Sequence, residues 1–151
     1  MATSTLVQYL STGVGTDVSH RGQTEVFLAS STVAVGDAVA LDLSKTADGD
    51  KTLFVVKADT DVATATAVVG IVLGSAQTNG TLTAGSKVLV AVSGLATANV
   101  DAATVAGAPL TVGATAGQLA IYTAASVYPV VAIAAEADTA NFAKVMFIKQ
   151  F

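Results

Sequence analysis

The chain has 151 residues, of which 52% are hydrophobic and only 12% are charged, and its formal net charge is −4. This length suits one domain with a real core, and the absence of cysteine excludes disulfides and thiolate metal sites. The negative charge and single arginine argue against a nucleic-acid role, and the apolar runs fall far short of the roughly 18 residues that a membrane helix needs.

The first 25 residues differ in character from the rest of the chain. They include the polar stretch STGVGTDVSHRGQT, in which Gly13 and Gly15 break any regular period. They contain no basic region followed by a long apolar one, which argues against a secretory signal. We therefore predict an extended N-terminal arm over 1–25 and a single β domain over 26–151.

A period-two pattern of apolar and β-branched residues begins at Glu25 and predicts the first strands of the domain. The run AVVGIVLGS is almost continuously apolar, as in a strand buried on both faces. Asn79-Gly80 is a hairpin signal between that strand and the next. The strands predicted in this half cover 25–30, 31–43 around a turn signal at Gly36-Asp37, 52–58, 67–75 and 87–94. The segments 44–51 and 59–67 are predicted to be loops.

The second half begins with a segment, 93–107, that lacks clean alternation. Asn99 or Asp101 is a candidate cap for a short helix there, although the valines and threonines disfavour helix. Further strands are predicted over 108–124 (two strands around a glycine turn), 126–136 and 144–151.

One sequence pattern, an apolar run followed by a lysine-led apolar run, occurs twice along the chain. VVGIVLGSA is followed after a polar gap by KVLVAV, and VVAIAAEA is followed in the same way by KVMFIK. With Gly36 and Gly117 introducing the first strand of each copy, this order indicates a degenerate duplication within one β domain. About nine short strands over this length predict an all-β fold, barrel-like or sandwich-like.

Few residues suggest catalysis. His20 lies beside Asp17 and Ser19, but three neighbours in a flexible arm cannot hold triad geometry. GTLTAGSK misses a phosphate loop because Ser86 intervenes before the lysine and a β run follows. Asn79-Gly80-Thr81 matches a glycosylation sequon, but without a signal peptide a hairpin is favoured. We therefore expect no catalytic residue and no cofactor.

Five aspartates fall within two neighbouring loops, and their oxygens could bind Ca²⁺. No glutamate follows at the spacing of a calcium loop, so solvated turn residues are favoured and no metal site is predicted. The aspartates are Asp42, Asp48, Asp50, Asp59 and Asp61.

Contact residues for a partner are sought at the two ends of the chain, where an aromatic side chain is not needed for a core. The candidates are Tyr9, His20 and Arg21 in the arm and Phe151 at the C-terminus.

The stretches VGDAVAL, VVGIVLGSAQTNGTLTAGSKVLVAVSGLA and GQLAIYTAASVYPVVAIAAEADTANFAKVMFIKQF resemble, in style and order, the decoration (cement) proteins of tailed-phage capsids. The resemblance covers roughly residues 31–151 and matches no site residue of that family. It implies a small β-barrel or β-tulip domain, often trimeric, without a cofactor. It also implies binding to major capsid protein on the outside of the virion after synthesis in the host cytoplasm, often with an N-terminal arm that reaches across neighbouring subunits.

Two other functions remain open. One is another virion or bacterial surface module, such as a head-fibre base or tail component. The other is a small-molecule or glycan-binding β-barrel, which the absence of tryptophan disfavours because sugars usually stack on Trp or Tyr. An enzyme is the least favoured class.

Overall fold

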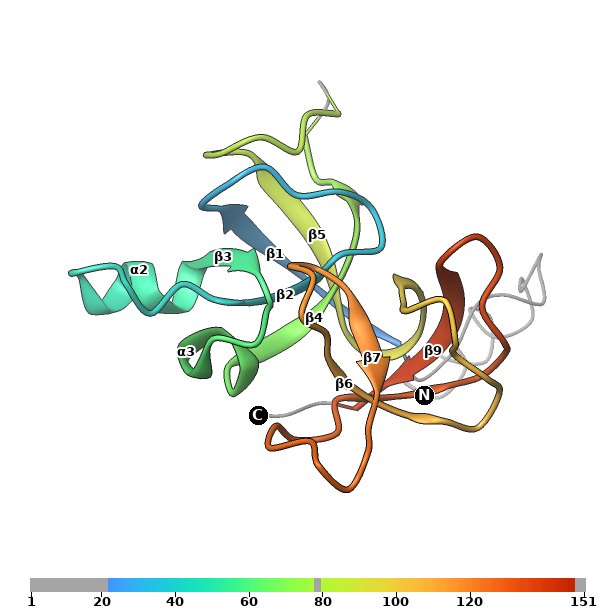
Figure 1. Ribbon diagram of the computed structural model, residues 1–151. Helices are drawn as coiled ribbons and strands as arrows, with labels where there is room; N and C mark the ends of the chain where they lie inside the picture. The colour runs from blue at the N-terminus through green and yellow to red at the C-terminus, as the bar shows by residue number, and fades with distance from the viewer. Residues whose placement is uncertain (1–21, 78–79, 149–151) are drawn as a thin grey trace, which may run out of the picture.

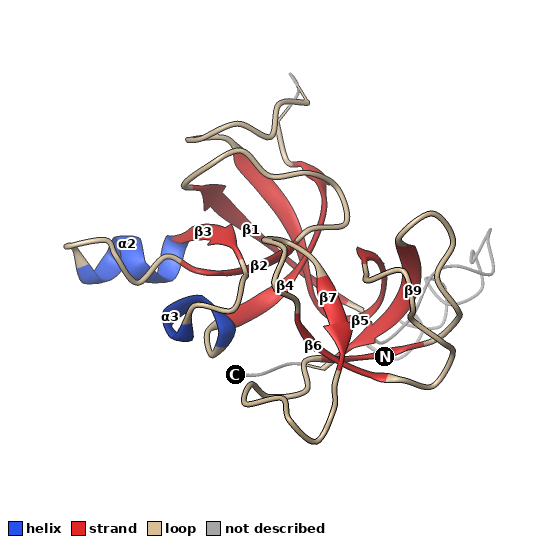
Figure 2. Ribbon diagram, viewed as in Figure 1, coloured by secondary structure: helices blue, strands red, loops and turns tan. Residues whose placement is uncertain are grey.

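The computed structural model describes residues 22–77 and 80–148, and these fold into nine strands and two short helices (Figures 1 and 2). The predicted all-β class is confirmed. The strands are β1 (Gln23–Ala29), β2 (Ala38–Leu41), β3 (Phe54–Lys57), β4 (Val68–Ser75), β5 (Lys87–Asn99), β6 (Pro109–Val112), β7 (Leu119–Ile121), β8 (Ala132–Ala134) and β9 (Phe142–Phe147). The helices are α2 (Asp48–Leu53) and α3 (Val62–Ala65).

Five of the strands close into a ring. β1 pairs in parallel with β3 and antiparallel with the first half of β5, while β2 and β4 join β3 to β5 in the order β1-β3-β2-β4-β5. A closed ring leaves no strand at an open edge, where backbone groups would lack partners. We call these five strands, with residues 87–93 of β5, the first unit.

β5 is long because it serves both halves of the molecule. Its residues 94–99 pair antiparallel with β9, and the sheet continues through β8 and β6 to β7. In Figure 1, β5 begins among the blue-to-green strands and leads to the orange-to-red strands. Val100, just after β5, forms a parallel bridge with Leu119 of β7. Residues 94–100 with β6, β7, β8 and β9 make the second unit.

The two units share one pairing pattern. β2 pairs with β3 and β4, and β4 with β5; likewise β6 pairs with β7 and β8, and β8 with β9. The register agrees at the pairs that both units make, outside the bulges of β2–β4 and β4–β5, so each of these paired positions has an equivalent in the other unit. Four pairs of the first unit each match one pair of the second unit. Ala29–Val55 matches Val100–Leu119, Val39–Gly70 matches Leu110–Ala132, Val72–Val90 matches Ala134–Val145, and Phe27–Val88 matches Ala98–Ala143.

The turn that leads into the second strand of each unit is also shared. Gly36 and Gly107 have φ values of +92° and +81°, and in each turn the next residue donates its N–H to the carbonyl three residues back. Glycine is needed because the third position of such a type II turn has positive φ. The turn equivalent to Gly36 is therefore at Gly107, and Gly117 instead precedes β7.

Two apolar clusters form the core. The first fills the interior of the first unit with residues such as Val39, Val55 and Val88. The second joins the interior of the second unit to the outer face of the first, where Ala38, Ile71 and others are buried. β4 is consequently covered on both faces over Val68–Val72, as predicted from its continuous apolar run.

Both helices lie in segments predicted as loops, beside β2 and β3 (Figure 2). α2 begins within 44–51 and takes Thr52 and Leu53 from the predicted strand 52–58, and none of its residues is buried. α3 occupies 62–65, where the Asp61 side chain accepts a hydrogen bond from the Ala63 N–H as an N-cap. With six and four residues, the two helices are too short to show an amphipathic period, which explains why the sequence pattern did not predict them.

The prediction of a short helix capped by Asn99 or Asp101 is wrong. Asn99 ends β5, opposite Phe142 of β9. Asp101 lies in a turn, where its carboxylate accepts the Ala102 N–H and its carbonyl accepts the Thr104 hydroxyl. Pairing with β9 decides the conformation of 94–99, and such tertiary pairing is invisible in the local pattern.

Of the predicted arm, residues 1–21 lie outside the described part of the chain. Gln23, Thr24 and Glu25 form the exposed start of β1 and are opposite residues of β5. Neither of the two helices described is long enough to cross a membrane.

Candidate functional site

A polar pocket opens beside β2 and α3. Its volume is about 410 Å³, and both serine hydroxyls and carboxylates face it. The residues that line it are Ser30, Ser31, Leu41, Asp42, Leu43, Ser44, Val56, Asp59, Asp61, Ala63 and Thr64.

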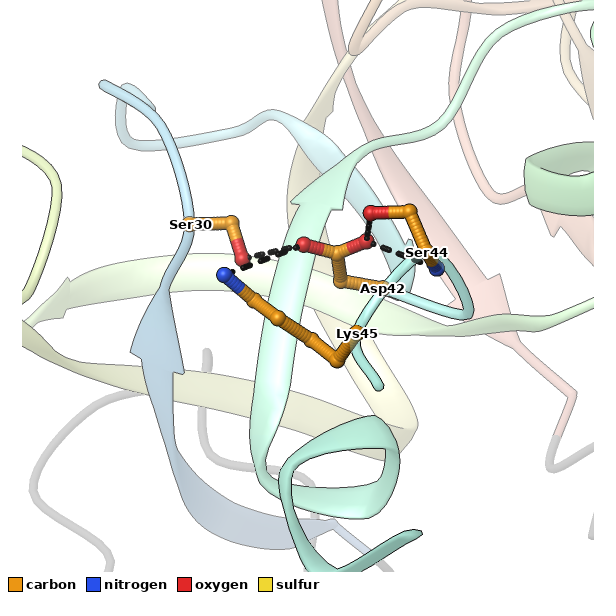
Figure 3. Close-up of polar contacts among 4 residues, drawn as sticks. All are labelled: Ser30, Asp42, Ser44 and Lys45. Atoms are coloured by element: carbon orange, nitrogen blue, oxygen red, sulfur yellow. Dashed lines mark hydrogen bonds and ion pairs between the residues drawn. The ribbon is translucent and has the colours of Figure 1, made fainter. Parts of the chain in front are cut away.

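Asp42 is the centre of this pocket's polar network (Figure 3). It directly follows β2, and its own N–H donates to the carbonyl of Phe54 at 2.8 Å, which holds the backbone against β3. Its Oδ2 accepts the Ser30 hydroxyl at 2.5 Å, and its Oδ1 accepts the Ser44 hydroxyl at 2.5 Å and the Ser44 N–H at 3.1 Å. Lys45 Nζ lies 3.6 Å from Oδ2. The carboxylate therefore ties the end of β1 to the segment after β2.

Two opposing effects set the pKa of Asp42. Burial raises it, because the charged form loses hydration, while the hydrogen bonds from Ser30 and Ser44 and the positive charge of Lys45 lower it. The hydrogen bonds and the lysine charge together outweigh the effect of burial, so the pKa of Asp42 lies below the ordinary value of 3.8. The folded protein holds Asp42 as a carboxylate.

The other carboxylates that line the pocket, Asp59 and Asp61, also have hydrogen-bond partners within the protein. Asp59 Oδ1 accepts the Thr64 hydroxyl at 2.7 Å and the Asp61 N–H at 2.8 Å, and Asp61 caps α3. Lys45 is also engaged, because its Nζ lies 4.5 Å from the ring centroid of Phe54. These groups bond mainly to one another, which identifies the network as a brace for the loops around β2.

We expect Asp42→Asn to lower the free energy of unfolding by about 1–2 kcal/mol near neutral pH, since hydrogen bonds to a charged group are lost. Because the folded pKa is depressed, the stabilisation exists above pH 3.8 and disappears as the pH falls through the folded pKa. Urea titrations at neutral pH and below pH 3.8 should therefore show a difference between the two proteins that shrinks in acid. A difference that stays constant with pH would contradict this account.

A second polar contact lies where the two units meet. Asp37 is buried, and its Oδ2 accepts the Ala34 N–H at 2.8 Å and lies 2.9 Å from Lys57 Nζ. A Cβ on Gly117 of the second unit would lie only 2.8 Å from the Asp37 carboxyl carbon, so the turn at Gly117 packs directly on this ion pair. The sequence marks Asp37 only as part of a turn signal with Gly36. Its ion pair with Lys57 was not predicted, because residues 20 positions apart become neighbours only through β2–β3 pairing.

The four predicted contact residues lie outside the described part of the chain: Tyr9, His20, Arg21 and Phe151. They stay predictions.

The five loop aspartates do not form one cluster. Asp42, Asp59 and Asp61 line the pocket, whereas Asp48 pairs with Lys51 on exposed α2 at 2.9 Å. Within residues 22–77 and 80–148, no three His, Cys, Asp or Glu side chains are placed to hold a metal ion. The segment that resembles a phosphate loop forms a turn at Thr83–Ser86 that leads into β5.

Comparison with solved structures finds chains of similar fold. The fold is similar to that of a phage capsid chain. The solved structure is "The capsid of Myoviridae Phage XM1", with a TM-score of 0.59, 17% sequence identity, and coverage of 86% of this chain and 85% of that chain. No protein-family model matches the chain, and no curated protein matches it. At this identity the similarity establishes a shared fold across most of both chains.

Proposed function

We propose that this protein is a virion structural protein that decorates the outer surface of a tailed-phage head, binds major capsid protein and stabilises the shell. The observation that carries the proposal is the fold shared with a chain of a phage capsid structure over 86% of the present chain. The sequence resemblance to decoration proteins over residues 31–151 points in the same direction. Together they favour a virion role over a ligand-binding barrel.

The physical character of the protein suits such a role. Its chain is small, sparsely charged and lacks clustered basic residues, so its partner is expected to be protein rather than nucleic acid. A homo-oligomer, a trimer by the family resemblance, would contact several lattice sites at once. Each contact could then be weak, because linkage raises the effective concentration at the remaining sites.

The test uses heads that lack this protein. A ligand that binds only the assembled lattice stabilises it by mass action. We therefore expect purified protein to sediment with these heads and to raise their melting temperature in a concentration-dependent way. Full-length protein that neither sediments with the heads nor shifts their melting would eliminate the cement role and favour the other virion or surface modules.

The arm is tested by deleting residues 1–21, which leaves every strand from β1 onward intact. We expect weaker binding to heads and an unchanged far-UV circular dichroism spectrum. Phe151→Ala should weaken binding less, since one ring contributes at most a few kcal/mol. Undiminished binding of the shortened protein would remove Tyr9, His20 and Arg21 as contacts while leaving the cement role to the domain.

A further inference from the structure

The first unit buries an apolar row across the outer face of its sheet. Ala38 lies opposite Ile71, and Ile71 lies opposite Ala91, so the three side chains are neighbours on β2, β4 and β5. Their exposed fractions are 0%, 0% and 3%. All three belong to the apolar cluster that also contains the interior of the second unit.

The second unit covers this row through specific backbone contacts. The Ala38 N–H donates to the Gly117 carbonyl at 2.8 Å, and the Gly117 N–H donates to the Ala58 carbonyl at 2.7 Å. The Asn99 N–H donates to the Gly36 carbonyl at 2.8 Å. In this fold, therefore, the outer face of one β unit is buried by another unit of the same kind.

The equivalent row in the second unit has no such cover within the described part of the chain. Pro109 lies opposite Ile133, and Ile133 opposite Met146, in the same register as the buried row. Met146 also lies opposite Leu95 of β5. Ile133 and Met146 are each 43% exposed, and Pro109 is exposed as well. We call Pro109, Ile133, Met146 and Leu95 the apolar row.

Two further features extend this surface. Tyr122, 36% exposed, is equivalent to the fully buried Ala58, because each donates its N–H to the first residue of the neighbouring strand. A groove of about 220 Å³ adjoins the row at Leu95 and is lined by Leu73, Leu95, Ala96, Thr97 and Lys144. Three buried alanines of the first unit are thus replaced by larger and more exposed residues in the second, and the buried Ile71 is replaced by the exposed Ile133.

We infer that the apolar row is the contact surface for a second copy of this chain. The chain itself shows what covers such a face, namely another β unit of this fold. The four residues of the row carry no charge, and apolar surfaces of this kind are typical of permanent homo-oligomers, whereas transient partners meet through more polar surfaces. The inference does not depend on the capsid role, because it concerns the free protein.

Sedimentation of the purified full chain without capsids tests it. We expect the wild-type protein to be oligomeric at micromolar concentration. Met146→Asp should weaken association by roughly a hundredfold or more, because a carboxylate would be buried without a partner. Val26→Asp is the matched control, since Val26 is 50% exposed on β1 of the first unit and lies outside the row. A monomeric wild type, or an oligomer that survives Met146→Asp, would overturn the inference.

A second measurement does not depend on how the aspartate variant folds. Because the chain has no cysteine, Met146→Cys and Val26→Cys each introduce a single thiol. We expect maleimide to label Cys at position 146 slowly at high protein concentration and fast on dilution, and at position 26 fast in both. Equal labelling at both concentrations would refute the second copy as occupant. Protection at position 146 only after heads are added would identify the capsid as occupant instead and leave the cement role standing.

Discussion

Replacing Gly70 with alanine is expected to lower the free energy of unfolding by about 3 kcal/mol or more, since a clash with core backbone cannot relax cheaply. A Cβ at this position would lie 2.1 Å from the Ala91 carbonyl oxygen and 2.6 Å from Val90 Cγ1. β5 cannot retreat from β4, because β1 is paired to it along the same residues. The extra methyl must therefore push apart the ring of the first unit.

Gly74→Ala is the matched control for this change. Gly74 lies on the same strand, and nothing is within 4 Å of a Cβ placed there. The expected change is within about 0.5 kcal/mol, as for other substitutions away from the core. Urea denaturation of both variants measures the contrast. Equal stability of the two would show that β5 does not hold its position as tightly as the pairing implies.

The second unit explains why Gly70 could not be recognised from the sequence. Its equivalent is Ala132, also buried, so the repeat itself does not demand glycine at this position. The requirement comes from the close approach of β5 to β4. A glycine inside an apolar run indicates some close backbone approach, but only the folded sheet shows which strand makes it.

Strand existence was the most predictable part of the fold. Alternation and β-branched content located the nine strands, and the unbroken apolar run at Val68–Val72 correctly indicated a strand covered on both faces. These signals are local, because burial of one or both faces of a strand directly determines the pattern of apolar and polar residues along it. The long reach of β5 was not predictable, since Leu95–Asn99 become a strand only by pairing with β9.

The sites were far less predictable than the strands. Asp42 was singled out as an aspartate in a loop, but its partner Ser30 comes from the end of β1, 12 residues earlier. The apolar row was missed because Ile133 and Met146 look like core residues of alternating strands. Their exposure follows from which faces the second unit buries, and this is a property of packing between units.

Replacing Lys57 with methionine should lower the free energy of unfolding by about 2–4 kcal/mol, because it leaves a buried charge without its partner. The Asp37 side chain is only 4% exposed, while that of Lys57 is 33% exposed, so the lysine, but not the aspartate, can find water when the pair is broken. Methionine keeps the apolar stem and removes the ammonium group. Within the described part of the chain, Asp37 would then retain only the Ala34 N–H as a hydrogen-bond partner, beneath the turn at Gly117.

An exposed ion pair of the same length is the control that separates the effect of burial from the effect of the contact itself. Lys51 and Asp48 are also 2.9 Å apart, but Asp48 is 97% exposed, so Lys51→Met should leave the unfolding midpoint unchanged.

A double-mutant cycle tests the buried pair itself. The double variant with Asp37→Ala and Lys57→Met should lose less free energy of unfolding than the sum of the two single variants, since no buried charge then remains. Chemical denaturation of the wild type, the two single variants and the double variant measures this difference. Strict additivity, or an equal loss at Lys51, would mean that the ion pair at the junction of the two units does not stabilise it through burial.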